Sequence, residues 1–365
     1  MLPAVRTSLL AAAALALAGC ASIDRRLAAC GDPVRAVGEW YELDVGDPSC
    51  AVATSDGGAY GDVHALYRIA SVSKLFMALA SERLAASGAV SLDRPVTELA
   101  RPGLPPEFGA VTVRDLLSHR SGLPRELLRT SSPSDVAHAI SCGFFDRDLY
   151  AGLNEPDALM RELSKPVWRE AVRGRNGSKY SNVGFGIAWM AIQDCTKRSF
   201  GEIAQRELFE PEGLVETAFD PASRPGLKAM KPCCGDIPWL KRRGSAAAEH
   251  PLGPVFSPGG GLWASASDCL AMARLCWPGI DRALAEHGGE ASVADGEIVA
   301  GLSARRLADG RLVLFRSGMI YGGASFVGFD VQSRRVAVIL RNVTSWPDDI
   351  GFWLLSQGRL GRKED

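Results

Sequence analysis

Strand-like patterns lie at both ends of the chain and helical patterns lie between them, and this order restricts the possible folds. Residues 34–68 alternate short apolar runs with turn residues such as those at 55–58, which is typical of antiparallel strand pairs. Residues 311–316, 324–331 and 335–343 have the composition of strands, and a short polar turn between the last two predicts a hairpin. We therefore predict an α/β fold in which an antiparallel sheet is built from both termini and flanked by helices, with a mostly helical domain inserted.

Helical periodicity marks the inserted region. Apolar residues recur at helical spacing in the segments 111–118, 156–163, 183–195 and 200–209. A further helical run follows at 266–277, and residues 348–357 predict an amphipathic helix. We place the sheet subdomain at about residues 34–70 and 255–365, and the helical subdomain at about residues 71–254.

Ser71 and Lys74 begin the helical region. A serine hydroxyl is a weak nucleophile at neutral pH, so an enzyme that uses it needs a base within hydrogen-bond reach. Residues i and i+3 share one face of a helix, and we expect a helix to begin near Ser71 and to end before Gly88. Its first N–H groups would favour a developing negative charge. Ser-x-x-Lys also occurs by chance, and an isolated match more often marks an N-capped helix with a solvated lysine.

Three further segments follow Ser71-Val-Ser-Lys74 in a fixed order. They are residues 111–124, which include His119, then Tyr180-Ser-Asn182, and then Arg316-Ser317-Gly318 at the end of a predicted strand. With these motifs the chain resembles the serine β-lactamase and penicillin-binding-protein superfamily. It is most similar to the branch that holds class C β-lactamases, D-alanyl-D-alanine carboxypeptidases and related esterases.

The resemblance implies a role for each matching catalytic residue. Ser71 would be the nucleophile that becomes acylated, and Lys74 would accept its proton or activate it electrostatically. Tyr180 would carry the proton to the leaving group and later help to activate water. A phenol has an ordinary pKa near 10, so it needs nearby positive charge to become a useful base, and Lys74 and Arg316 would supply that charge.

The resemblance also implies how a substrate would be held. Asn182 would hydrogen-bond Lys74 and the acyl side chain of the substrate, while Arg316, Ser317 and Gly318 would bind the substrate from the strand. The backbone N–H groups of Ser71 and Met319 would form the oxyanion hole. We expect His119 to shape a turn and pack beneath the site without taking part in the chemistry.

Arg316 departs from the family pattern, in which lysine or histidine begins the third motif. Arginine keeps a permanent positive charge and a bidentate fork for carboxylates, but it cannot donate a proton. β-Lactams and acyl-D-alanine peptides carry a carboxylate at that end, whereas many simple esters do not. Arg316 therefore favours a small-molecule or peptide substrate that is anionic.

We predict a serine hydrolase that works through a covalent acyl-enzyme on Ser71 and hydrolyses a β-lactam or a D-alanyl peptide amide. Two alternatives stay open. A carboxylesterase of the same family would differ in pocket shape and in the rate at which water reaches the acyl-enzyme. A non-catalytic receptor would bind cell-wall peptide, although such a receptor is expected to lack the serine, the lysine or the tyrosine.

The first 19 residues have the pattern of a secretory signal. Arg6 gives the positive start, and residues 8–18 form an apolar core too short to span a bilayer. Small residues directly before Cys20 resemble a bacterial lipobox, which implies that Cys20 is lipidated; the alternative is an ordinary signal with an incidental cysteine. We expect residues 20–33 to tether the protein to the periplasmic face of the cell envelope. Ala21 favours the outer membrane by the usual bacterial sorting pattern.

Charge and cysteine content limit the remaining partners. The net charge of −1 gives no excess of basic residues of the kind that binds nucleic acid.

Besides Cys20 the chain has eight cysteines, and in an exported protein this even number suggests disulfides, although the sequence does not show which cysteines pair. Cys269 and Cys276, if they share a helix, lie about 10 Å apart, too far to bridge. The chain has no metal-ligand spacing such as Cys-x-x-Cys, so we expect no metal and no cofactor, and the oligomeric state stays open.

Overall fold

The computed structural model describes residues 32–43, 50–100, 103–127, 150, 152–153, 155–233 and 252–357. The predicted signal peptide at 1–19, the lipidation site Cys20 and nearly all of the predicted tether lie outside the described residues. Within the described residues, none of the helices combines the length and the apolar character that crossing a bilayer requires.

The central element is a seven-stranded antiparallel sheet. Its strands, in spatial order, are β2 (Ala59–Tyr60), β1 (Cys50–Thr54), β10 (Val336–Arg341), β9 (Gly323–Asp330), β8 (Leu312–Ile320), β7 (Leu302–Arg306) and β6 (Ile298–Val299). Strand β1 pairs with β10, so the N-terminal and C-terminal parts of the chain meet inside the sheet. β9 and β10 form the predicted hairpin. The predicted fold class is confirmed, although β6 and β7 were not expected.

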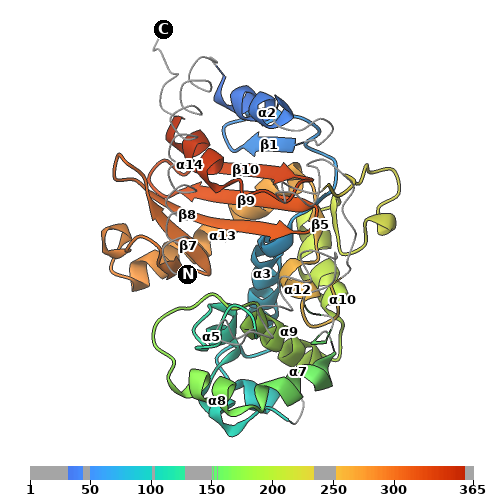
Figure 1. Ribbon diagram of the computed structural model, residues 1–365, viewed down its shortest axis with the longest axis vertical. Helices are drawn as coiled ribbons and strands as arrows, with labels where there is room; N and C mark the ends of the chain where they lie inside the picture. Colours follow the sequence, from blue (N-terminus) through green and yellow to red (C-terminus); the bar gives the residue numbers. More distant parts are fainter. Residues whose placement is uncertain are drawn as a thin grey trace, which may run out of the picture.

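Helices cover both faces of this sheet (Figure 1). On one face lie α2 (Pro33–Leu43) and α14 (Asp348–Gln357), whose apolar side chains pack against β1, β9 and β10. On the other face lies α13 (Ala266–Glu286), which contacts β1 and β10. Each face buries an alternating set of strand side chains, so the strands are buried along most of their length.

The prediction of strands at residues 34–43 was wrong, because this segment is helix α2. Its start has ordinary helix signals: Asp32 Oδ1 accepts hydrogen bonds from the N–H groups of Val34 and Arg35, and Pro33 is the first helical residue. Val34, Val37 and Tyr41 are buried at helical spacing. The short apolar runs resembled strand alternation, and the cap at Asp32 was the signal that would have corrected the prediction.

Below the sheet in Figure 1 lies the helical region. Its main helices within the described residues are α3 (Ser73–Ala86), α5 (Val113–Leu117), α7 (Pro156–Leu163), α8 (Pro166–Arg173), α9 (Asn182–Thr196) and α10 (Phe200–Ala204). All but α8 were expected from periodicity. A small sheet with the order β3 (Tyr67–Arg68), β5 (Trp263–Ala264), β4 (Thr217–Ala218) was not expected. It joins β3 and β5, which flank the helical region in sequence, with β4, which lies within that region.

The cysteine expectations are only partly addressed by the described residues. Cys195, Cys269 and Cys276 carry free thiols. Cys269 and Cys276 both lie on α13, in agreement with the expectation that they cannot bridge each other.

Candidate active site

Ser71 lies in a tight turn directly before helix α3. The turn, η1 (Ala70–Val72), is a 3₁₀ helix, so the α-helix begins two residues later than we expected. Ala70 has a φ of 45°, a left-handed conformation that is unfavourable for a residue with a side chain. The carbonyl of Ile69 accepts a hydrogen bond from Ser325 Oγ on β9 at 2.6 Å. This bond ties the strained turn to the sheet and fixes the position of Ser71.

Strand β8 passes close beside this turn. A Cβ atom on Gly318 would lie 2.5 Å from the carbonyl oxygen of Ile69 and 2.7 Å from the nitrogen of Ser71, so only glycine permits the approach. In the described part of the chain, β7 pairs with β8 only over residues 312–315, which leaves the backbone of residues 316–320 beside Ser71 without a strand partner on that side. This is the position from which backbone N–H groups can serve an oxyanion hole.

Lys74 projects from the first turn of α3 to the Ser71 hydroxyl. Its Nζ donates hydrogen bonds to Ser71 Oγ at 3.2 Å and to the carbonyl of Gly259, on α12 (Ser257–Gly260), at 2.7 Å. Lys74 is only 4% exposed. Burial lowers the pKa of its ammonium group, although the neighbouring Tyr180 phenol acts in the opposite direction. The lowered pKa moves this amine toward the range in which it can accept a proton.

Tyr180 reaches the same hydroxyl from a distant part of the chain. Its OH donates a hydrogen bond to Ser71 Oγ at 2.8 Å, and Lys74 Nζ lies 5.3 Å from the centre of its ring. Burial by itself would raise the pKa of the phenol, but the positive charges of Lys74 and Arg316, and the hydrogen bonds that the ionised phenolate accepts from Lys74 and Ser71, outweigh burial and lower the pKa to about 8. Ser71, Lys74 and Tyr180 thus meet at one hydroxyl, as a nucleophile with two candidate bases.

Arg316, on β8, lies against the Tyr180 ring. Its Cζ is 4.8 Å from the ring centre, and the residue is only 4% exposed. Its Nε is buried and has no hydrogen-bond partner among the described residues. Burial lowers the pKa of the guanidinium group, but arginine stays charged at neutral pH. The arginine therefore places a permanent charge beside the phenol.

His119 lies on the other side of Tyr180, with the two ring centres 4.5 Å apart. Its Nδ1 accepts a hydrogen bond from the backbone N–H of Ser181 at 3.2 Å, so this nitrogen carries no proton. Burial, together with the charges of Arg316 and Lys74, lowers the pKa of His119 well below its ordinary value. The imidazole is neutral at pH 7 and supports Tyr180 from behind, in the packing position that we expected.

Asn182 is the first residue of α9, which is capped by the side chain of Ser181. The Asn182 Nδ2 donates hydrogen bonds to Glu126 Oε1 at 2.6 Å and to the hydroxyl of Tyr150 at 3.3 Å. Its Oδ1 is buried and has no partner among the described residues. We expected a bond between Asn182 and Lys74; instead, the Lys74 ammonium donates to Gly259 and Ser71.

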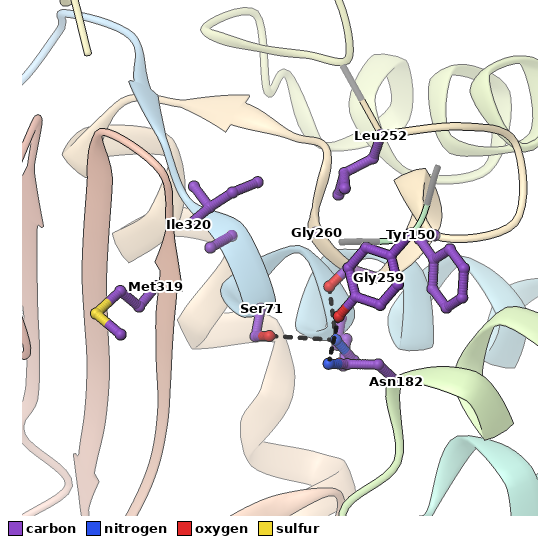
Figure 2. Close-up of a pocket in the computed structure, with 11 residues that line it drawn as sticks. Ser71, Tyr150, Asn182, Leu252, Gly259, Gly260, Met319 and Ile320 are labelled. Atoms are coloured by element: carbon purple, nitrogen blue, oxygen red, sulfur yellow. Dashed lines mark hydrogen bonds between the residues drawn. The ribbon is translucent and has the colours of Figure 1, made fainter. Parts of the chain in front are cut away.

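A pocket in front of Ser71 is lined by Lys74, Tyr150 and Asn182 (Figure 2). Ser71, Tyr150 and Asn182 point toward one another in its centre, and Leu252, Phe256 and Ile320 form apolar walls. Met319 also lines the pocket, but its side chain points away from Ser71, so its backbone is the part available to a substrate.

Ser317 lies between Arg316 and Gly318 on β8, and strand alternation therefore points its side chain to the opposite face of the sheet. There it lies near Asp348: burial raises the pKa of the Asp348 carboxyl, and Ser317 partly opposes this effect. A substrate in front of Ser71 could thus reach only the backbone of Ser317.

Three residues of the site were not predicted from the sequence. Gly259 belongs to a glycine run without an evident chemical role, and only its contact with Lys74 shows one. Glu126 and Tyr150 lie in segments without a recognisable pattern. The pKa of the Glu126 carboxyl is raised by burial, although hydrogen bonds from Tyr150 and Asn182 act against this. Among the described residues, no group of three or more His, Cys, Asp or Glu side chains is arranged to hold a metal ion.

Comparison with known sequences identifies the family of the chain. A family model described as Beta-lactamase matches residues 44–354. The D-alanyl-D-alanine-carboxypeptidase/endopeptidase AmpH of Escherichia coli (strain K12) is 23% identical over 206 residues, which are 56% of this chain and 46% of that protein. Penicillin-binding protein 4* of Bacillus subtilis (strain 168) is 29% identical over 154 residues, or 42% of this chain and 30% of that protein. The matches thus span less than half the length of these relatives.

Solved structures share the fold over a larger part of the chain. An octameric penicillin-binding protein homologue from Pyrococcus abyssi has a TM-score of 0.64 at 20% identity, and the match covers 88% of this chain and 75% of that chain. A D-stereospecific amidohydrolase from Streptomyces sp. has a TM-score of 0.63 at 20% identity, covering 90% and 98%. A class C β-lactamase mutant has a TM-score of 0.62 at 14% identity, covering 89% and 96%. At these identities the likeness shows the fold alone.

Proposed function

Because the chain belongs to the β-lactamase family, we propose that it is a serine hydrolase that forms a covalent acyl-enzyme on Ser71. The observation that carries this proposal is the Ser71 hydroxyl, which is hydrogen-bonded to both Lys74 and Tyr180. The strained Ala70 and the close approach of Gly318 support it, since both hold Ser71 against the backbone of β8.

Acylation begins when Ser71 Oγ attacks the carbonyl carbon of the substrate and its proton passes to the Tyr180 phenolate or the Lys74 amine. With a pKa of about 8, roughly a tenth of Tyr180 is ionised at pH 7. The N–H groups of Ser71 and Met319 stabilise the oxyanion, which is worth about 3 kcal/mol per donor. Tyr180 then protonates the leaving group, and in the second half of the reaction it accepts a proton from the water that cleaves the acyl-enzyme.

The substrate class that we propose is an amide with an anionic end, such as a β-lactam or a D-alanyl peptide. Arg316 supports this choice because its Nε is a buried donor without a described acceptor. AmpH and the D-stereospecific amidohydrolase are named for amide substrates. One observation favours a carboxylesterase as the second candidate. The Arg316 guanidinium packs on the Tyr180 ring and does not line the pocket, so it is not placed to bind a substrate carboxylate there. A receptor without activity is disfavoured because Ser71, Lys74 and Tyr180 are all present.

We also propose that Cys20 is lipidated and that the protein is anchored at the periplasmic face of the cell envelope, in the outer membrane. The support is the short apolar segment that ends in small residues before Cys20. Metabolic labelling with a palmitate analogue tests this proposal. We expect incorporation that is lost in Cys20→Ala, and label that persists in this variant would contradict the assignment.

Intact mass measurement after incubation with a fluorescent penicillin or a p-nitrophenyl ester tests the hydrolase. A lasting adduct on Ser71 indicates a penicillin-binding role, rapid loss of the β-lactam ring indicates a lactamase, and ester turnover alone indicates an esterase. Ser87→Ala, at the end of α3, is the matched control because its hydroxyl bonds only to the local Leu84 carbonyl. Full turnover by Ser71→Ala would refute the mechanism.

A further inference from the structure

Two buried oxygen atoms beside the Ser71 pocket have no hydrogen-bond donor among the described residues. They are Oδ1 of Asn182 and Oε2 of Glu126. A buried acceptor without a donor loses its hydration without compensation, at a cost of about 1–3 kcal/mol, so such atoms are rare unless a ligand supplies the donor. Asn182 lines the same pocket as Ser71, so a substrate held there lies beside its side-chain amide.

The orientation of the Asn182 amide follows from its neighbours. The Glu126 carboxylate can only accept hydrogen bonds when it is ionised, and its Oε1 lies 2.6 Å from Asn182 Nδ2. The hydroxyl of Tyr150 takes a second bond from the same nitrogen, and the Tyr150 ring is held by stacking on Phe256 at 4.1 Å. Both donors of the amide group are therefore directed at these partners, and the oxygen is the atom left for a ligand.

We infer that the acyl part of the substrate carries an N–H donor, a free amino group, which binds to Asn182 Oδ1. This inference rests on the proposed acyl-enzyme at Ser71 and specifies its substrate class as amides or esters of amino acids or peptides with a free ammonium group. N-acylation removes the positive charge and leaves a single N–H on the same nitrogen, so an N-acylated substrate offers Asn182 Oδ1 only a neutral and weaker hydrogen bond. Glu126 is a positioning residue: it holds the amide in place.

The charges around Asn182 agree with an ammonium group. Glu126 places a negative charge next to the Asn182 amide, which partly offsets the positive charges of Lys74 and Arg125, since both cations interact with its carboxylate. An incoming ammonium would thus meet a negative charge directly behind the amide. The apolar residues Leu252 and Phe256 line the same pocket and would contact the hydrocarbon part of the acyl group.

The test compares alanine p-nitroanilide with N-acetylalanine p-nitroanilide, each in the D and L configurations, on the full-length protein. p-Nitrophenyl acetate, which has neither an amine nor an amide in its acyl part, reports the reactivity of Ser71 itself. For at least one enantiomer we expect kcat/KM to be about tenfold or more higher for the free amine, mainly through KM, because a charge-assisted hydrogen bond is lost on acetylation.

Glu126→Gln is the informative variant. Its side-chain amide can donate to Asn182 Oδ1, so the Asn182 amide can turn over and present its nitrogen to the pocket. We expect the preference for the free amine, measured as the ratio of kcat/KM for the free and the acetylated anilide, to fall about tenfold or more; this ratio does not depend on the absolute activity of the variant. A role of Glu126 in folding alone would lower the rates of all substrates together. Glu98→Gln is the matched control, since Glu98 is exposed and pairs with Arg94 on the surface.

The outcomes separate the two proposals. Turnover of p-nitrophenyl acetate together with equal or faster turnover of the acetylated anilides would overturn the inference and leave the acyl-enzyme standing. An absence of turnover of every substrate, together with an unmodified Ser71, would overturn the proposed function and the inference with it. If Glu126→Gln does not fold, the inference is tested by the ratio of kcat/KM for the free and the acetylated anilide in the wild-type protein.

Discussion

Replacing Arg316 with glutamine should raise the pKa of Tyr180 and shift the pH dependence of the reaction. The guanidinium carbon lies 4.8 Å from the centre of the phenol ring. A unit charge at that distance is worth about 3.5 kcal/mol at an effective dielectric constant of ~20, and about half of that where water in the neighbouring pocket adds to the screening. The smaller value corresponds to roughly one pKa unit. We therefore expect the pKa to rise from about 8 to roughly 9 or higher.

The ascending limb of a plot of kcat/KM against pH reports the base of the free enzyme. p-Nitrophenyl acetate is a suitable substrate because it has no carboxylate, so that losing a carboxylate-binding group does not affect its binding. At pH 7 the ionised fraction of Tyr180 should fall from roughly a tenth to roughly a hundredth. We expect about tenfold lower kcat/KM for Arg316→Gln at pH 7, with recovery as the pH rises above 9.

Two further variants test whether the charge of Arg316 and its burial cause the low pKa of Tyr180. Arg316→Lys keeps the positive charge and should keep its ascending limb close to pH 8. Arg125 also lies near the Tyr180 ring, at 5.1 Å, but its side chain is 60% exposed, so water screens its charge and Arg125→Gln should shift the limb much less. An unchanged limb in Arg316→Gln, or equal shifts in Arg125→Gln and Arg316→Gln, would refute the reasoning.

Three other substitutions give distinct outcomes. Ser71→Ala should abolish covalent labelling and lower turnover at least about a thousandfold without a change in thermal unfolding, whereas Ser87→Ala should behave as wild type, as followed by intact mass and differential scanning fluorimetry. Gly318→Ala should destabilise the fold by roughly 2 kcal/mol and reduce labelling of Ser71, because its Cβ would press on Ile69 and Ser71, while Gly279→Ala on α13 meets no atom within 4 Å and should be neutral or stabilising in urea unfolding. Asp268→Asn should remove a pH dependence of stability: burial raises the pKa of the Asp268 carboxyl from 3.8 to about 6. The protonated Asp268 carboxyl therefore stabilises the wild-type fold below pH ~4, and this stabilisation of roughly 2 kcal/mol is lost as the pH rises through 6. Urea midpoints that change equally between pH 4.5 and pH 7 in the wild type and in Asp268→Asn would contradict this.

Periodicity was a sufficient guide where an element depends on its own residues. The helices α7 and α14 and the β9–β10 hairpin have the expected positions because their apolar spacing and turn residues lie within one short segment. Helix α2 was mistaken for strands because its apolar residues form short runs. The small sheet of β3, β4 and β5 was missed because two-residue strands carry no pattern of their own and form only where three distant segments meet.

The sequence by itself determined which reactive side chains are available and in which order, since Ser71, Lys74, Tyr180 and Arg316 occur in motifs that can be read locally. Only the tertiary structure decided what surrounds each of them. The lowered pKa of Tyr180, the carbonyl of Gly259 on Lys74 and the direction in which Asn182 turns its amide all arise between segments far apart in the chain. The physical reason is that burial and electrostatic fields depend on distances in space, which packing sets and residue spacing along the chain does not.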